Sequence, residues 1–181
     1  MMKFLKKNII YLLLLAVLAA VAFIPGVKKL FLPVATVESH LNIPVADYDV
    51  QLKGINTTST NLKNFHGKKV LFLNFWGTWC KPCLDEWPSI QKLYENKKDD
   101  MDFVLIAMLD EEEKVRKFLK ENNYTAPVYL AETPINSSIL PKVFPTTFVL
   151  DKHGRILQKE TSSKDWNSES SRQFIENVIK P

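Results

Sequence analysis

The stretch VLFLNFWGTWCKPCLDEWP, residues 70–88, joins a continuous apolar run to the only two cysteines of the chain, Cys80 and Cys83. A short apolar run that ends at turn residues is typical of a strand buried on both faces. The segment that follows, 81–97, has the pattern of a helix. The two cysteines are therefore expected at a turn between a buried strand and a helix.

This position predicts a redox-active cysteine pair. The first turn of a helix has unpaired backbone N–H groups and a partial positive charge, which stabilise a thiolate at Cys80. Cys83 lies three residues later, so its sulfur returns to the same helical face. We expect Cys80 to attack a substrate disulfide and Cys83 to resolve the mixed disulfide. Pro82 suits an early helical position, where its missing N–H costs nothing.

Strand and helix patterns alternate along the rest of the chain. Strands are expected at 48–52, 67–76, 102–109, 126–132, 146–151 and 155–160. Helices are expected at 81–97, 110–122 and 170–180. The last two strands are joined at the segment 152–154 as a hairpin. Strands separated by helices predict an α/β fold, a three-layer α/β/α sandwich.

Charge and hydropathy set the N-terminus apart. Residues 1–32 contain five lysines and no acidic residue, whereas residues 33–181 carry 19 basic and 20 acidic side chains. The near-neutral body argues against a nucleic-acid partner, because it offers no basic excess for phosphate binding. Twenty uncharged residues, 8–27, lie between Lys7 and Lys28. As a helix they are long enough to cross the roughly 30 Å hydrocarbon core of a bilayer.

We therefore expect a transmembrane anchor at 1–32, a linker at 33–46 and a folded domain at 47–181. The alternative is a cleaved signal peptide, for which Ala20 and Ala22 offer a weak cleavage site. Both alternatives export the domain. Three lysines before the span and two after it slightly favour a cytoplasmic N-terminus, with the bulk of the chain outside.

The cysteine pair has two alternative roles, a metal site and a structural disulfide. A closed zinc site needs four ligands, and the remaining candidates, His40, His66 and His153, have no paired spacing. We therefore expect no bound metal. A purely structural disulfide at this spacing closes a loop too short to add much stability.

Two motifs in order, NFWGTWCKPC followed by EWP and then FPTTFVLDKHGRI at 144–156, resemble the thioredoxin superfamily. More narrowly, they resemble the membrane-anchored TlpA/ResA/CcmG-type thiol–disulfide oxidoreductases of bacteria. The similarity covers roughly residues 42–180. It implies a thioredoxin-like fold in which Cys80 is the exposed, attacking thiol and Cys83 the buried, resolving one.

The resemblance also implies which residues meet the substrate. Pro145 takes the place of the cis-proline that faces the cysteine pair, and the Phe144 backbone is expected to pair with an extended substrate segment. Trp79 is expected to shape the surface around Cys80. With Pro82, these residues are the candidate substrate-binding set.

The proton chemistry departs from ordinary thioredoxins. Those proteins commonly carry a buried aspartate where this chain has Asn74, and an amide cannot accept and release a proton. Glu86, three residues after Cys83, is the candidate replacement, since the resemblance places a functional glutamate there. The alternative is a solvated acid that complements the helix dipole.

The sequence thus predicts a single-pass membrane protein with an extracytoplasmic catalytic domain, expected as a monomer, and the resemblance implies a bacterial host. No cofactor is needed, because the electrons travel on the cysteine pair. The resemblance implies reduction of disulfides in exported proteins, apocytochrome c being one candidate, with electrons from a membrane thiol–disulfide carrier. The alternatives are a disulfide-donating oxidant, a peroxidase on the same fold, or a copper- or haem-handling protein.

Overall fold

The computed structural model describes residues 42–180. The expected membrane span at 8–27 and most of the linker at 33–46 lie outside this range. Among the described residues, every helix is too short or too polar to cross a membrane.

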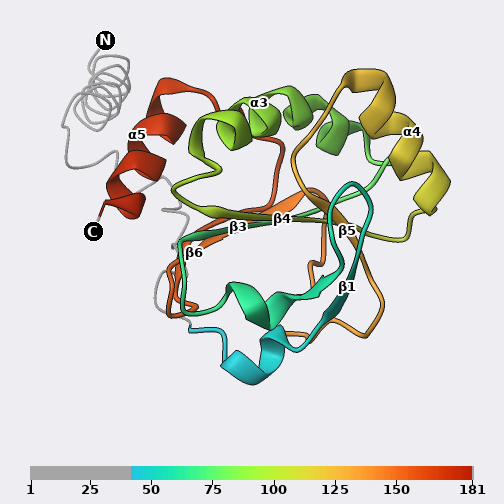
Figure 1. Cartoon of the computed structure of the whole chain (residues 1–181). Coiled ribbons are helices and arrows are strands. Elements are labelled where there is room, and N and C mark those ends of the chain that lie inside the picture. Colours follow the sequence, from blue (N-terminus) through green and yellow to red (C-terminus); the bar gives the residue numbers. More distant parts are fainter. Residues whose placement is uncertain (1–41, 181) are drawn as a thin grey trace, which may run out of the picture. The chain divides into compact units, whose positions relative to one another are not determined.

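The centre of the domain is a seven-stranded mixed sheet in the order β2-β1-β5-β4-β3-β6-β7 (Figure 1). The strands are β1 (Gln51–Gly54), β2 (Thr60–Asn61), β3 (Leu71–Trp76), β4 (Asp102–Ala107), β5 (Val128–Ala131), β6 (Thr146–Leu150) and β7 (Ile156–Glu160). Strands β3, β4 and β5 run parallel, and the remaining pairings are antiparallel. All six residues of β3 are buried, which explains its continuous apolar sequence.

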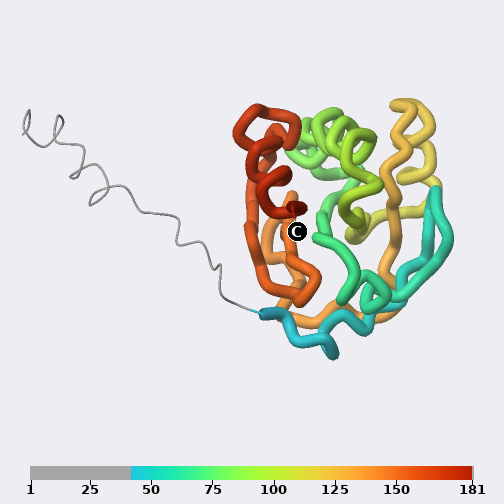
Figure 2. Tube along the Cα trace, turned by 60° about the vertical axis from the view of Figure 1, so that its left-hand side comes forward, coloured from blue at the N-terminus to red at the C-terminus, as the bar shows by residue number. Residues whose placement is uncertain are grey.

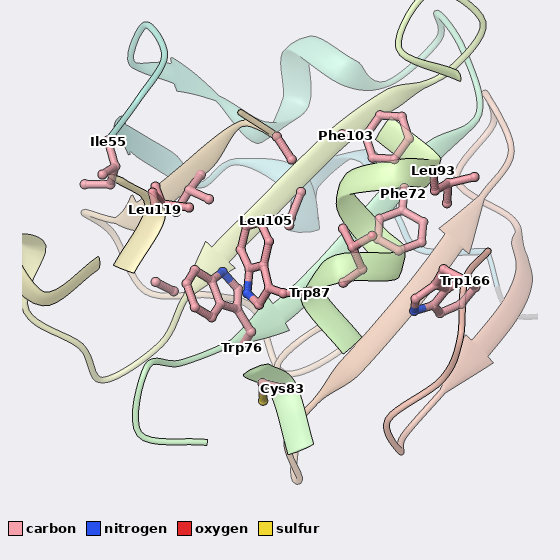
Figure 3. Close-up of a cluster of buried hydrophobic side chains, with 14 of the residues drawn as sticks. Ile55, Phe72, Trp76, Cys83, Trp87, Leu93, Phe103, Leu105, Leu119 and Trp166 are labelled. Atoms are coloured by element: carbon pink, nitrogen blue, oxygen red, sulfur yellow. The ribbon is translucent and has the colours of Figure 1, made fainter. Parts of the chain in front are cut away.

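Three helices cover one face of this sheet: α3 (Lys81–Lys97), α4 (Glu112–Asn122) and α5 (Glu169–Ile179) (Figure 1). Their buried side chains join one apolar cluster with alternate residues of β3 and β4. Figure 3 shows Trp76 of β3 beside Trp87 of α3, whose ring centroids are 4.6 Å apart. Cys83 belongs to the same cluster, so the helix that carries the cysteines is fixed by aromatic packing.

The other face is covered by two short 3-10 helices, η1 (Val45–Tyr48) and η2 (Leu62–Phe65), and by loops. Figure 2 shows the N-terminal end of the described chain, in cyan, running along this side. Ile43 and Tyr48 are buried there against the second apolar cluster. Ile43 also donates its backbone N–H to Gly154 O at 3.0 Å, so the chain packs on the domain from this point onward.

The structure confirms some of the elements expected from the sequence and corrects others. The α/β class and the hairpin of β6 and β7 are confirmed, with Gly154 at φ +79 in the turn. The first strand begins at Gln51 rather than 48, because Val45–Tyr48 forms a 3-10 helix that buries Tyr48. Strand β2 was not predicted, since its two residues are too few to show a periodic pattern.

Candidate active site

Cys80 and Cys83 form a disulfide at the N-terminus of α3, directly after the loop that leaves β3. Cys80 is the N-cap residue of the helix, and its Sγ accepts the backbone N–H of Cys83 at 3.3 Å. Pro82 lies exposed in the first turn, as its missing N–H allows. The helix N-terminus therefore points an N–H group at the sulfur of Cys80, in the place expected to stabilise a thiolate.

The expected exposure of Cys80 is wrong in this oxidised state. Cys80 is only 5% exposed, and Cys83 is completely buried. The reason is that Cys80 Sγ is bonded to Cys83 and folded against the first helical turn. Cys80 is nevertheless the more exposed of the two cysteines, as expected for the attacking residue.

The loop between the strand and the cysteines is held by the loop that follows β4. Asp110 accepts two hydrogen bonds from Thr78, one from its backbone N–H and one, at 2.8 Å, from its hydroxyl. Trp79 Nε1 donates to Met108 O at 2.9 Å. A Cβ on Gly77 would stand 2.5 Å from Trp79 Nε1, so only glycine lets the indole lie in this place.

The candidate substrate-binding residues come together from distant parts of the sequence. The Phe144–Pro145 peptide bond is cis, as the resemblance implies. The rings of Trp79 and Phe144 meet edge to face, with centroids 5.3 Å apart. Trp79 is 52% exposed, which leaves much of its ring open to a ligand beside Cys80. The loop before β6 thus forms one rim of the cysteine site.

Glu86 is buried beneath this site, where only 2% of its surface is exposed. One carboxyl oxygen, Oε1, accepts Asn74 Nδ2 at 3.0 Å. The other, Oε2, accepts the backbone N–H of Lys164 at 3.3 Å and Trp166 Nε1 at 3.4 Å. Glu86 is therefore a buried acid held by three donors from β3 and the 161–168 loop, and the alternative of a solvated first-turn acid is wrong.

The environment of Glu86 places its titration near neutral pH. Burial raises the pKa of Glu86 to about 7, and the hydrogen bonds from Asn74, Lys164 and Trp166 oppose that rise. The charge of Glu160 adds a smaller upward contribution to the pKa. A carboxyl group with this pKa exchanges protons readily at the pH where thiols react.

Asn74 holds Glu86 from strand β3. Its Nδ2 donates both to Glu86 Oε1 and, at 2.8 Å, to Thr147 Oγ1, while its Oδ1 is buried without a partner. The amide as placed suits an ionised Glu86. Turned over, the same amide would offer an acceptor to a protonated carboxyl group, with the Thr147 hydroxyl able to donate instead.

Sequence reasoning missed several residues of this site. Asp110 and Thr147 come from segments expected only as a helix start and a buried strand. Trp166 and Lys164 lie in the polar segment that links the last expected strand, 155–160, to the last expected helix, 170–180. An isolated tryptophan in such a tract was the one available signal, because a large apolar side chain among polar neighbours indicates burial.

A mixed sheet, a Cys-X-X-Cys disulfide capping the helix that follows the buried strand β3, and a cis-proline loop beside it define a thioredoxin-like protein. The Redoxin family model matches residues 42–176. The chain belongs to the Redoxin family, and its Cys80–Cys83 pair stands in the matched region.

Named relatives agree with this assignment. The thioredoxin-like protein YneN of Bacillus subtilis is 36% identical over 111 residues, which cover 60% of this chain and 65% of YneN. The match thus spans just under two thirds of that relative. The thiol-disulfide oxidoreductase ResA of Geobacillus thermodenitrificans is 30% identical over 132 residues, or 72% of this chain and 74% of ResA.

Solved structures show the same fold. StoA from Bacillus subtilis superposes with a TM-score of 0.59 at 24% identity, covering 69% of this chain and 94% of StoA. A secreted thiol-disulfide isomerase from Corynebacterium glutamicum gives a TM-score of 0.59 at 22% identity, covering 81% and 92% of the two chains. The thioredoxin-like fold expected from the sequence is confirmed.

Proposed function

We propose that this protein is a thiol–disulfide oxidoreductase that exchanges disulfides through a mixed disulfide between Cys80 and its substrate. The observation that carries the proposal is the Cys80–Cys83 disulfide at the N-terminus of α3, beside the rim formed by Trp79 and the cis Phe144–Pro145 bond. This arrangement gives one sulfur access to a substrate and keeps its partner buried.

The reaction begins with the reduced pair. The Cys80 thiolate attacks one sulfur of a substrate disulfide, and the other substrate sulfur leaves as a thiolate that takes a proton. Cys83 then loses its proton and attacks Cys80 Sγ, which releases the second substrate thiol. Two electrons pass to the substrate, and the pair returns to the disulfide found in the structure.

The helix N-terminus favours the first step. The Cys83 N–H that reaches Cys80 Sγ at 3.3 Å is one of the donors that lack a partner within the helix. It stabilises negative charge on Cys80 without requiring a nearby cationic side chain. Lys81 is paired with Asp85 and its side chain is 78% exposed, so it adds little at the sulfur.

Glu86 is proposed to take the proton that Cys83 loses in the second step. It lies three residues after Cys83 on the same side of α3, and both residues are buried. Its pKa of about 7 lets it accept a proton and return it to solvent between turnovers. Asn74, which cannot itself carry the proton, is proposed to hold the carboxyl group in both states by turning its amide.

Replacing Glu86 by Gln tests this role. The variant keeps the size of the side chain but cannot accept the proton. We expect the rate of disulfide exchange at pH 7 to fall on the order of tenfold or more and to lose the inflection near pH 7. The measurement is the single-turnover rate of oxidation of the reduced protein between pH 5 and 9. An unaltered profile would reduce Glu86 to a structural acid.

We further propose that the domain works outside the cytoplasm as a monomer, tethered to a bacterial membrane by the segment 1–32. The apolar span at 8–27, with lysines on both sides, supports this placement. The proposed direction is reduction of disulfides in exported proteins, with apocytochrome c as a candidate substrate and a membrane thiol–disulfide carrier as electron donor. These last two assignments rest on the resemblance to the ResA group.

A further inference from the structure

Exposed apolar side chains gather around the cysteine site. Within residues 42–180, five large hydrophobic side chains are exposed. Trp79 precedes Cys80, and Val143 precedes the cis-proline loop. Leu109 lies in the loop after β4, next to Met108, whose carbonyl accepts the hydrogen bond from Trp79. Leu140 lies in the segment leading to that loop, and only the fifth, Val45, belongs to the opposite layer. Concentration of exposed apolar surface at one place indicates an interaction site.

Leu109 is the most exposed of these side chains, at 86%, and its backbone adopts a left-handed conformation with φ 51. A leucine rarely takes this conformation, because its Cβ crowds the following carbonyl oxygen. Hydrogen bonds of the two neighbouring residues hold it in place. The Met108 N–H donates to Trp76 O, and the Met108 carbonyl accepts a hydrogen bond from Trp79 Nε1. The Asp110 carboxylate accepts two hydrogen bonds from Thr78. The active-site loop itself therefore keeps this leucine directed outward.

A groove of about 490 Å³ runs beside Leu109. The pairing of β4 with β5 ends at Ile106 and Tyr129. The residues that follow in each strand, Ala107 and Leu130, line the groove, so it opens where the two strands separate. Its apolar lining includes Met108, Leu130, Pro134, Ile135 and Leu140. Asp110 is the acidic residue of the lining, and its carboxylate accepts two hydrogen bonds from Thr78.

We propose that Leu109 and this groove bind a large apolar side chain of the substrate protein, a few residues from the cysteine that Cys80 attacks. The groove adjoins the cysteine site, because the indole of Trp79, adjacent to Cys80, donates a hydrogen bond to the backbone carbonyl of the groove residue Met108. When a substrate cysteine is bonded to Cys80, the side chains next to that cysteine therefore lie close to this surface. The inference rests on the proposed exchange activity and adds a sequence preference to it.

The test compares two disulfide peptides that differ only in the residues flanking the cysteines, leucine in one and asparagine in the other. The full chain, reduced and held in lipid nanodiscs, is mixed with each peptide, and its oxidation is followed by alkylation and mass spectrometry. We expect the leucine peptide to react with a half-saturating concentration roughly fivefold lower than the asparagine peptide. Glutathione disulfide, which has no apolar side chain, serves as the reference substrate.

Leu109→Asn is the decisive variant, because asparagine accepts the left-handed backbone while losing the apolar side chain. We expect it to remove the preference for the leucine peptide and to leave the rate with glutathione disulfide unchanged. Val45→Asn is the matched control: Val45 is also an exposed apolar residue, at 55%, but lies in the opposite layer. It should keep the full preference.

The outcomes separate the two proposals. If the wild-type chain fails to react with any disulfide, glutathione disulfide included, the proposed function is wrong. If it reacts but Leu109→Asn retains the leucine preference, the groove does not bind substrate and this inference is overturned. The inference is also overturned if the chain forms dimers in sedimentation that Leu109→Asn dissociates, since the occupant is then a second copy.

Discussion

Replacing Cys80 by serine is expected to lower the rate of disulfide exchange on the order of a thousandfold or more. Serine has no thiolate at neutral pH, and the attack on a substrate disulfide requires one. The fold should survive the change, since serine is close in size and takes the same N-cap position in α3. The measurement is the single-turnover rate with a protein disulfide, with circular dichroism to verify folding.

Cys83→Ser is the matched variant, and its expected result is different. Cys80 remains able to attack, but the mixed disulfide with the substrate is no longer resolved. A covalent complex should therefore accumulate and be visible on a non-reducing gel, whereas Cys80→Ser forms none. Accumulation of the complex in Cys80→Ser, with none in Cys83→Ser, would reverse the roles of the two cysteines.

The second large effect is on the pH dependence of stability. Burial raises the pKa of Glu86 to about 7 in the folded protein, against 4.5 for an ordinary glutamate. The stabilisation linked to this group is therefore present below about pH 4.5 and is lost as the pH rises through 7. At about 1.4 kcal/mol per pH unit, the loss between pH 5 and 8 is roughly 2 to 3 kcal/mol.

Glu86→Gln should remove this loss. A glutamine has no proton to lose, so the variant should gain roughly 2 to 3 kcal/mol relative to wild type between pH 5 and 8. Urea unfolding of both proteins with the disulfide intact, followed by tryptophan fluorescence, measures the difference. Glu113→Gln, at an exposed glutamate of α4, is the control and should track wild type. Parallel curves for Glu86→Gln and wild type would contradict the assigned titration.

The fold was predictable where burial leaves a local pattern. Strand β3 reads as a continuous apolar run because both of its faces are buried, and the glycine in the segment 152–154 marks the hairpin turn. Which elements cover each face of the sheet was harder to predict from the sequence. Helices α3, α4 and α5 all lie on one face, whereas 3-10 segments too short for a periodic pattern cover the other.

The site was predictable only in part, for a similar reason. Trp79, Cys80 and Cys83 lie within one short stretch of the chain, and the cis bond at Pro145 was expected from a motif resemblance. Glu86 stayed ambiguous, because a glutamate in a first turn is commonly solvated, and only the 161–168 loop packing over it makes it a buried acid. Contacts between segments so distant in sequence leave no local signal.

The reduction potential of the Cys80–Cys83 couple tests the central claim most directly. The full chain is equilibrated with thiol–disulfide buffers of known potential, and the reduced fraction is measured by alkylation. A reductant of exported disulfides should have a potential of about −270 mV or lower, where thioredoxin lies. A value near −120 mV, that of strong periplasmic oxidants, would contradict the proposed direction and make the protein a disulfide donor.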